Sequence, residues 1–195
     1  MTPSNAEVAD YIRQVEAIKA DAVALASRLG DEPFNWQPGP NRWSAGQCLE
    51  HLNITHRAML PRMREAAERT RASGRRAAGA TRHGFLMRWF INGMEPPPKR
   101  RYRTGAGFVP PSDVSREPVL AEFTKLHDDL LRLLEQLDGY DLGAAKVQSP
   151  FAKWLRYKLG SAIALQMAHD RRHLWQALEA VEAYRTGAVK REQTA

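Results

Sequence analysis

Apolar residues recur every three or four positions in four long stretches, and this spacing is the feature that most restricts the fold of the chain. Because these intervals match the α-helical turn, we predict helices over about 5–29, 44–74, 117–137 and 158–184. No stretch shows the alternation of a convincing strand. The chain is therefore predicted to be all-α, a four-helix bundle with a long crossover connection between the second and third long helices.

Residues typical of helix ends support these boundaries. Gly30 follows the first apolar stretch and is expected to close that helix. Ser44 and Gln47 have the spacing of a capping box at the start of the second helix. Pro61 interrupts the second stretch and is expected to kink it, whereas Pro118 falls in the first turn of the third helix, where proline is tolerated.

The length of 195 residues suits a single domain over residues 1–195. We expect an irregular basic insertion at about 73–117 and a frayed tail at about 186–195. Within the insertion, residues 85–91 are apolar enough for a short helix or a buried segment, and they offer a surface for a homodimer. Residues 151–155 are predicted to form a helical turn.

The only cysteine, Cys48, excludes an internal disulfide and any site built from several thiolates. The simplest interpretation of this low cysteine content is that the protein works in a reducing compartment. The longest apolar run, residues 22–26, is far too short to cross a bilayer, and no apolar stretch follows the polar N-terminal residues. We therefore expect a cytoplasmic protein with no membrane partner.

The formal charge of +7 directs attention to acidic partners. Thirteen of the 29 basic residues lie between Arg57 and Arg103, with Tyr102 among them and Trp89 shortly before the last of them. Such a cluster can form a surface for nucleic acid or an acidic protein. No nucleic-acid recognition motif is present, so we do not expect nucleic acid as a partner.

Two histidines four residues apart, His169 and His173, point to metal chemistry. On a helix they lie on one face, about 40° apart, and such a pair can share one metal ion. No glutamate follows the first histidine, so the pair is not the zinc-protease motif. On the second helix, His51 falls at the edge of the apolar face and His56 within it, and spacing alone leaves both open as a third ligand. Alternatively, these histidines bind no metal ion and instead pack in the core or lie on the surface.

Other polar residues accompany these histidines. Asp170 is expected either to orient a ligand histidine or to pair with an arginine. Cys48, one turn from His51, is more typical of a core residue than of a nucleophile. The further residues that we place in or around the pocket are Gln166, Thr55, His56, His127 and Arg172. Tryptophans 36, 43 and 175 either line a substrate pocket or pack in the core.

Several of these motifs, in this order, resemble the DinB/YfiT-like superfamily. They are Asn35-Trp36-Gln37-Pro38-Gly39-Pro40-Asn41-Arg42-Trp43-Ser44, Cys48-Leu49-Glu50-His51-Leu52, Ser149-Pro150-Phe151, and His169 to Gln176 with its paired histidines. The resemblance implies a four-helix bundle that holds a divalent metal, often nickel or zinc, by three histidines. Carried over by position, these are His51, His169 and His173, which selects His51 over His56. The central insertion and its triple proline depart from the family pattern.

Three neutral imidazoles leave a zinc-like ion with an open position, as in catalytic sites. The resemblance implies either a thiol-dependent S-transferase or isomerase or a metal-dependent hydrolase, and we favour an S-transferase that joins a low-molecular-weight thiol to a small electrophile. The alternatives are a hydrolase of a small molecule that uses a metal-bound water, and a non-catalytic metal-binding, nucleic-acid-binding or acidic-partner-binding protein. Arg171, Arg172 or the basic run 99–103 can contact the carboxylates of such a thiol, although a solvated surface position is the more common role for any one of these charges. No residue stands out as a general base.

Overall fold

The computed structural model describes residues 3–98, 100, 102–152 and 154–192, with side chains described as far as residue 187. Its described part is mostly helical, as predicted. The helices are α1 (Ala6–Ala26), α2 (Asp31–Asn35), α3 (Ala45–Ala72), α4 (Phe85–Met94), the short 3-10 helix η1 (Ala106–Phe108), α5 (Arg116–Glu135) and α6 (Leu159–Glu192).

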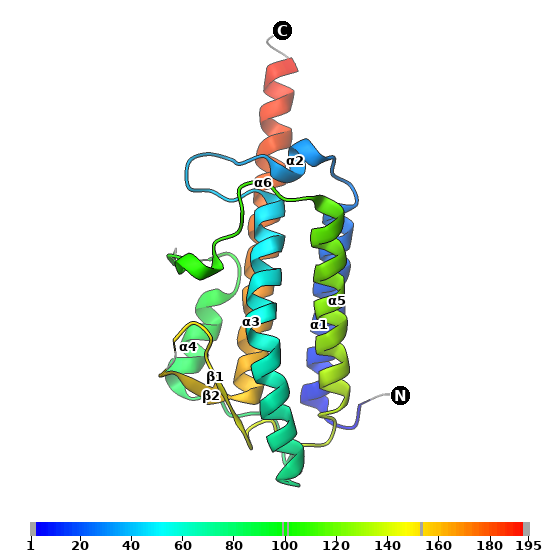
Figure 1. Cartoon of the computed structure of the whole chain (residues 1–195), viewed down its shortest axis with the longest axis vertical. Coiled ribbons are helices and arrows are strands. Elements are labelled where there is room, and N and C mark those ends of the chain that lie inside the picture. The colour runs from blue at the N-terminus through cyan, green and yellow to red at the C-terminus, as the bar shows by residue number, and fades with distance from the viewer. Residues whose placement is uncertain (1–2, 99, 101, 153, 193–195) are drawn as a thin grey trace.

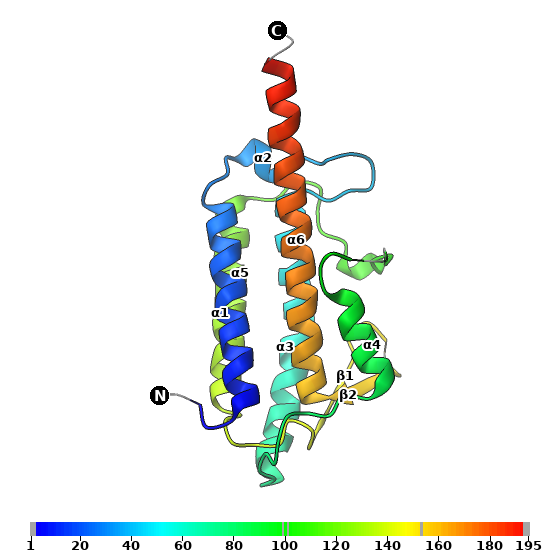
Figure 2. The same cartoon turned by 180° about the vertical axis from the view of Figure 1, so that it is seen from behind.

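The four long helices lie along one another, and their apolar faces enclose the core (Figure 1). α1 packs against α5 and α6, and α3 packs against the same two helices. The connection between α3 and α5 carries α4 and η1, and α4 packs against α6 on the outer side (Figure 2). The segment that we predicted to be irregular therefore contains a helix of ten residues.

The prediction that the chain contains no strand is wrong. β1 (Lys146–Gln148) and β2 (Arg156–Lys158) pair antiparallel, with Val147 opposite Tyr157. Each strand has three residues, which is too short for a visible alternation of apolar and polar positions. The predicted helical turn at 151–155 lies in the loop between these strands, and Lys153 lies outside the described residues.

The helix ends agree with the predicted caps at one site and differ at two others. The capping box forms at α3, where Gln47 N–H donates to Ser44 Oγ and Ser44 N–H donates to Gln47 Oε1. Gly30 does not close α1, which ends at Ala26 with Ser27 as its cap, and instead caps the start of α2. α6 continues to Glu192, beyond the predicted end near 184.

The predicted apolar faces form most of the core, with exceptions at two helices. Val23 of α1 and Leu178 of α6 are exposed, and Ala22, Ala26 and Ala177 are buried in their helices instead. Alanines let neighbouring helices approach closely, and hydrophobic size alone does not identify them as core positions. None of the described helices combines the length and the apolar character needed to cross a membrane.

Candidate metal centre

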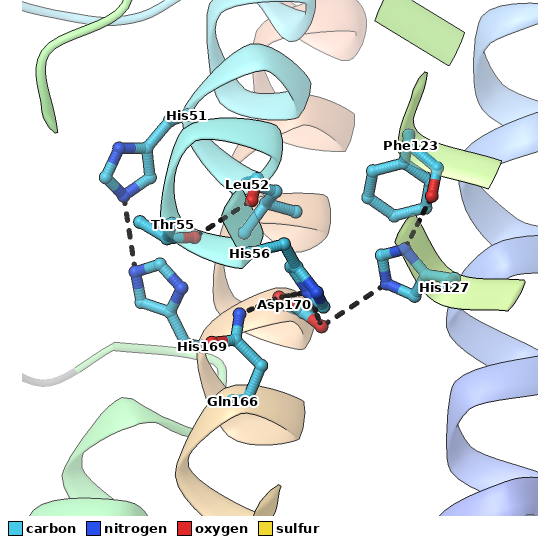
Figure 3. Close-up of polar contacts among 9 residues, drawn as sticks. All are labelled: His51, Leu52, Thr55, His56, Phe123, His127, Gln166, His169 and Asp170. Carbon is cyan, nitrogen blue, oxygen red and sulfur yellow. Dashed lines mark hydrogen bonds and ion pairs between the residues drawn. The ribbon is translucent and has the colours of Figure 1, made fainter. Parts of the chain in front are cut away.

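Two helices bring three histidines together between them. His51 comes from the second turn of α3, and His169 and His173 come from successive turns of α6. One ring nitrogen of each lies within 4.8 Å of the corresponding nitrogens of the other two. The Nε2 atoms of His51 and His169 are 3.3 Å apart and face each other (Figure 3). The structure thus brings together the three residues that the family resemblance selected.

The orientation of His51 is set by a contact from η1. The Nδ1–H of His51 donates to the carbonyl oxygen of Phe108 at 2.7 Å, because a carbonyl can only accept. This tautomer leaves the Nε2 lone pair of His51 free to face the other two histidines. A carbonyl bonded to the second nitrogen is the usual partner of a metal-binding imidazole.

Trp43 covers the same group from the segment before α3. Its ring centroid lies 4.8 Å from that of His51 and 5.6 Å from that of His173, with which it is stacked. Of the three tryptophans considered from sequence, only Trp43 lies at the histidines. Trp36 packs on Tyr184, and Trp175 lines a surface pocket with Leu174 and Leu178.

All three imidazoles are held neutral. Burial lowers the pKa of His51, and the hydrogen bond to Phe108 offsets this only in part. Burial lowers the pKa of His169 to about 3, and the nearby His51 imidazole adds to this because the two rings oppose each other's protonation. Burial and the other two histidines lower the pKa of His173 well below its ordinary value. Neutral imidazole is the form that binds a metal ion.

The donor set and its spacing fit a divalent ion. Two nitrogens bonded to one tetrahedral zinc ion, each about 2.05 Å from it, lie about 3.3 Å apart. That is the separation of the Nε2 atoms of His51 and His169. In addition, the buried Nδ1 of His173 has no hydrogen-bond partner in the described part of the chain, so its desolvation is uncompensated there.

A second polar group lies deeper in the core, around the carboxylate of Asp170 (Figure 3). The Nε2–H of His56 donates to both carboxylate oxygens, at 2.9 and 3.1 Å. The amide of Gln166 donates to Oδ1 at 2.9 Å. His127 donates from Nδ1 to the carbonyl of Phe123, and its Nε2 lies 3.4 Å from Asp170 Oδ2 without a hydrogen bond.

In the described part of the chain, Asp170 therefore neither orients one of the three histidines nor pairs with an arginine, which were the two roles considered from sequence. Burial opposes the ionisation of this carboxyl, but His56 and His127 outweigh it and hold the pKa of Asp170 well below its usual range. His56, His127 and Asp170 form a second group close enough to hold a metal ion. We name these three residues, with Gln166, the inner cluster.

Two of the remaining candidates are core or helix residues. Cys48 is fully buried, and burial raises the pKa of its thiol, so it is not poised as a nucleophile. The hydroxyl of Thr55 donates to the carbonyl of Leu52 in its own helix. His83, which lies outside both histidine groups, is half-buried, and its Nδ1 lies 2.9 Å from the hydroxyl oxygen of Ser161.

Arg171 and Arg172 have different surroundings. Arg171 is bound to both oxygens of Glu95 and to Gln14. Arg172 is 8% exposed and donates only to two carbonyls, that of Gly93 at 3.3 Å and that of Arg100 at 2.6 Å. It has no carboxylate partner within the described residues. In the predicted basic run 99–103, residues 99 and 101 lie outside those residues.

Sequence reasoning missed Phe108 and Gly93, whose carbonyls contact His51 and Arg172. Both act through the backbone, so their side chains carry no signal. They also lie in the insertion, where no periodicity relates one segment to the helices.

Comparison with known proteins identifies one family. The family model described as the DinB superfamily matches residues 14–177 of the chain. This range includes all three histidines of the centre and the whole inner cluster. Searches among curated proteins and among solved structures found no matching protein.

Proposed function

The chain belongs to the DinB superfamily, and from this premise we propose that it is a metal-dependent enzyme. In this proposal His51, His169 and His173 hold a divalent nickel or zinc ion. The observation that carries it is the convergence of three neutral imidazoles, with ring nitrogens within 4.8 Å of one another and the His51–His169 pair at the separation that a tetrahedral ion requires. We also infer that α1, α3, α5 and α6 form a four-helix bundle, a fold whose metal sites lie between facing helices.

The surroundings of the centre favour a thiol as the nucleophile. A divalent ion held by His51, His169 and His173 would supply a site that favours the thiolate form of a thiol. Activation of water, by contrast, is usually assisted by a general base within hydrogen-bond reach. Within the described part of the chain, no carboxylate is hydrogen-bonded to the three histidines, and Asp170 faces the inner cluster. We therefore favour S-transfer over hydrolysis.

The reaction that we propose joins a low-molecular-weight thiol to a small electrophile. The sulfur forms a bond to an electrophilic carbon as the bond from that carbon to the leaving group breaks. The leaving group departs with the bonding electrons, and the proton of the thiol passes to solvent. Arg172 favours a thiol that carries a negatively charged group, because its buried guanidinium has no carboxylate partner in the described residues and can pair with such a group. Its charge is also close enough to contribute to the lowered pKa values of His169 and His173.

Metal content tests the centre directly. Elemental analysis of protein purified without a histidine tag is expected to give about one nickel or zinc ion per chain. The His173→Ala variant is expected to lose this ion, whereas the matched His83→Ala variant is expected to keep it, because His83 lies beside Ser161 and outside the centre. Wild-type protein that contains no metal after growth and purification in metal-supplemented medium contradicts the proposal.

Turnover tests the reaction. Metal-loaded protein is expected to consume an alkylating electrophile only when a thiol is present, and His51→Ala is expected to abolish this activity. Thiol-independent hydrolysis of an ester or amide that also stops in His51→Ala would identify the protein as a hydrolase. Unchanged turnover in His51→Ala would remove the metal from the reaction.

A further inference from the structure

Most of the large apolar side chains that the structure exposes come from two segments, 82–112 and 146–158. In the described part of the chain nine large hydrophobic residues are exposed, and only Val23 and Leu178 lie outside these segments. The other seven are Phe85, Leu86, Trp89, Tyr102, Val109, Phe151 and Trp154. Trp154, in the loop between β1 and β2, is 84% exposed, and Leu86 of α4 is 77% exposed.

The two segments form one continuous surface. α4, η1 and the β1–β2 hairpin all lie on the same side of the long helices in both views (Figures 1 and 2). Lys158 of β2 donates to the carbonyl of Arg82, which precedes α4. Phe108 of η1 packs on Phe151 of the hairpin loop, with ring centroids 4.6 Å apart. We name the surface of these two segments the basic aromatic face.

The same face carries the positive charge of the protein. Among the residues that the structure describes, segments 82–112 and 146–158 contain seven basic residues and one acidic residue, a formal charge of +6. The rest of the chain has 19 basic and 21 acidic residues, a formal charge of −2. The single acidic residue of the face, Glu95, is paired with Arg171 of α6. The positive charge of the protein is therefore concentrated on this face, and the rest of the chain is close to neutral.

We propose that the basic aromatic face binds the surface of an anionic membrane. Exposed tryptophan and phenylalanine side chains partition into the headgroup region, and lysine and arginine beside them are attracted to anionic lipids. Each basic residue near such a surface strengthens binding by about fivefold. In this arrangement the long helices stand off the membrane, and the side chains of α4 and of the hairpin loop enter the interface.

Two other occupants fit this face less well. A second copy of the chain, docked through the same face, would place one charge of at least +6 against another, and like charges repel across an interface. Nucleic acid would engage the arginines, but it offers little to the exposed apolar side chains of Phe85, Leu86 and Val109. A bilayer surface satisfies both the charge and the apolar side chains.

Our expectation of no membrane partner was drawn from the lack of a spanning segment. A surface-bound protein needs none, so the finding that no described helix could cross a membrane is compatible with this proposal. The proposal also stands apart from the proposed enzymatic function, since it uses neither the metal nor the three histidines.

Vesicle binding tests the proposal. The full chain is mixed with phosphatidylcholine vesicles with and without about one-third phosphatidylserine, at an ionic strength of about 0.1 M. We expect co-sedimentation and a blue shift of tryptophan emission with the anionic vesicles alone, both reversed at about 1 M salt. A protein that stays in the supernatant with anionic vesicles overturns the proposal.

Matched variants locate the contact. Leu86→Ser and Arg88→Gln change exposed residues of the face, and Leu178→Ser and Arg28→Gln change exposed residues outside it. We expect the first pair to weaken vesicle binding by about fivefold or more each, and the second pair to leave it within about twofold. Equal losses in both pairs overturn the proposal.

Two further outcomes would assign the face to another partner. Light scattering without vesicles that shows a dimer lost in Leu86→Ser would assign it to self-association. Salt-sensitive binding to duplex DNA, without binding to anionic vesicles, would assign it to nucleic acid. Either outcome overturns the membrane proposal, and neither affects the test of metal content.

Discussion

At the scale of single residues, α6 shows how neighbours in sequence serve different sites. Successive residues on a helix point about 100° apart. His169 and His173 therefore share one face, which meets His51, while Asp170 faces the inner cluster and Arg172 faces the segment that follows α4. Five consecutive residues of one helix thus supply a candidate metal centre, a buried carboxylate and a cation.

The inner cluster predicts a large stability cost when its charge is removed. Asp170→Asn replaces a fully buried carboxylate that accepts hydrogen bonds from His56 and Gln166. We expect the free energy of unfolding in urea to fall by about 3–5 kcal/mol. The control, Asp128→Asn, breaks a partly exposed pair with Lys19 and should cost about 1 kcal/mol or less. Equal losses would show that the inner cluster has no special role in stability.

The two arginines predict a selective change in substrate affinity. Arg172→Gln should raise the KM for an anionic thiol by about tenfold or more, because a charge-assisted hydrogen bond is lost. The KM for neutral 2-mercaptoethanol should change little. Arg171→Gln is the control, since Arg171 is occupied by Glu95 and Gln14. A similar rise for both thiols would indicate that Arg172 only supports the local structure.

At the scale of elements, the start of α3 is positioned by close packing against α2 and the segment before α5. A Cβ atom on Gly46 would lie 2.6 Å from a ring carbon of Phe34 and 2.7 Å from a methyl group of Val114. Only glycine permits this approach. The contact fixes the N-terminal end of the helix that carries His51 one and a half turns later.

This packing predicts opposite effects at two helical glycines. Gly46→Ala should destabilise the protein by about 1–3 kcal/mol, because overpacking outweighs the better helix propensity of alanine. Among the described residues, a Cβ atom in Gly93→Ala, within α4, would meet only the Tyr102 hydroxyl, at an ordinary 3.5 Å. It should be neutral or stabilise by up to about 1 kcal/mol. Thermal or urea unfolding measures both, and a stabilising Gly46→Ala would contradict the contact.

At the scale of the whole molecule, the candidate centre joins α3 to α6, so a bound ion would connect helices distant in sequence. A ligand that binds only the folded state stabilises that state by mass action. The proposed metal is therefore expected to stabilise the fold as a whole, in addition to any catalytic role.

Zinc or nickel at about 100 times its dissociation constant should raise stability by about 2.7 kcal/mol. For a chain of this size the midpoint of thermal unfolding should rise by about 5–10 °C. His51→Ala should show no rise, whereas His83→Ala should respond like the wild type. An equal rise in His51→Ala would place the ion elsewhere, with the inner cluster as the first site to examine.

Acid should destabilise the metal-free protein from a higher pH than its carboxyl groups alone would. The pKa values of His51, His169 and His173 are lowered in the folded state, so below about pH 6.5 the unfolded chain binds protons that the folded site does not. Their contribution is fully present above that pH. It is lost as pH falls, by up to about 1.4 kcal/mol per pH unit for each histidine. Urea unfolding between about pH 6.5 and 5 measures how the free energy of unfolding falls with pH. This fall should be less steep for His173→Gln than for the wild type, and an equally steep fall would contradict the lowered pKa.

Much of the local structure could be predicted from the sequence by itself. The three- and four-residue spacing located the four long helices, Ser44 and Gln47 identified a capping box, and the four-residue interval placed His169 and His173 on one face. These features depend on residues within one or two helical turns of each other, so a local pattern contains them. The same reasoning failed at β1 and β2, where three residues are too few to show a period.

Only the tertiary structure decided which elements meet. Helical angle left His51 and His56 equivalent as partners of the α6 pair, and the fold placed His51 with that pair and His56 with Asp170. The carbonyl of Phe108, the separate surroundings of Arg171 and Arg172, and the joining of α4 with the hairpin into one charged face likewise arise from contacts between distant segments. The periodicity of one helix determines which side is buried, whereas its neighbours are determined by the packing of the whole chain.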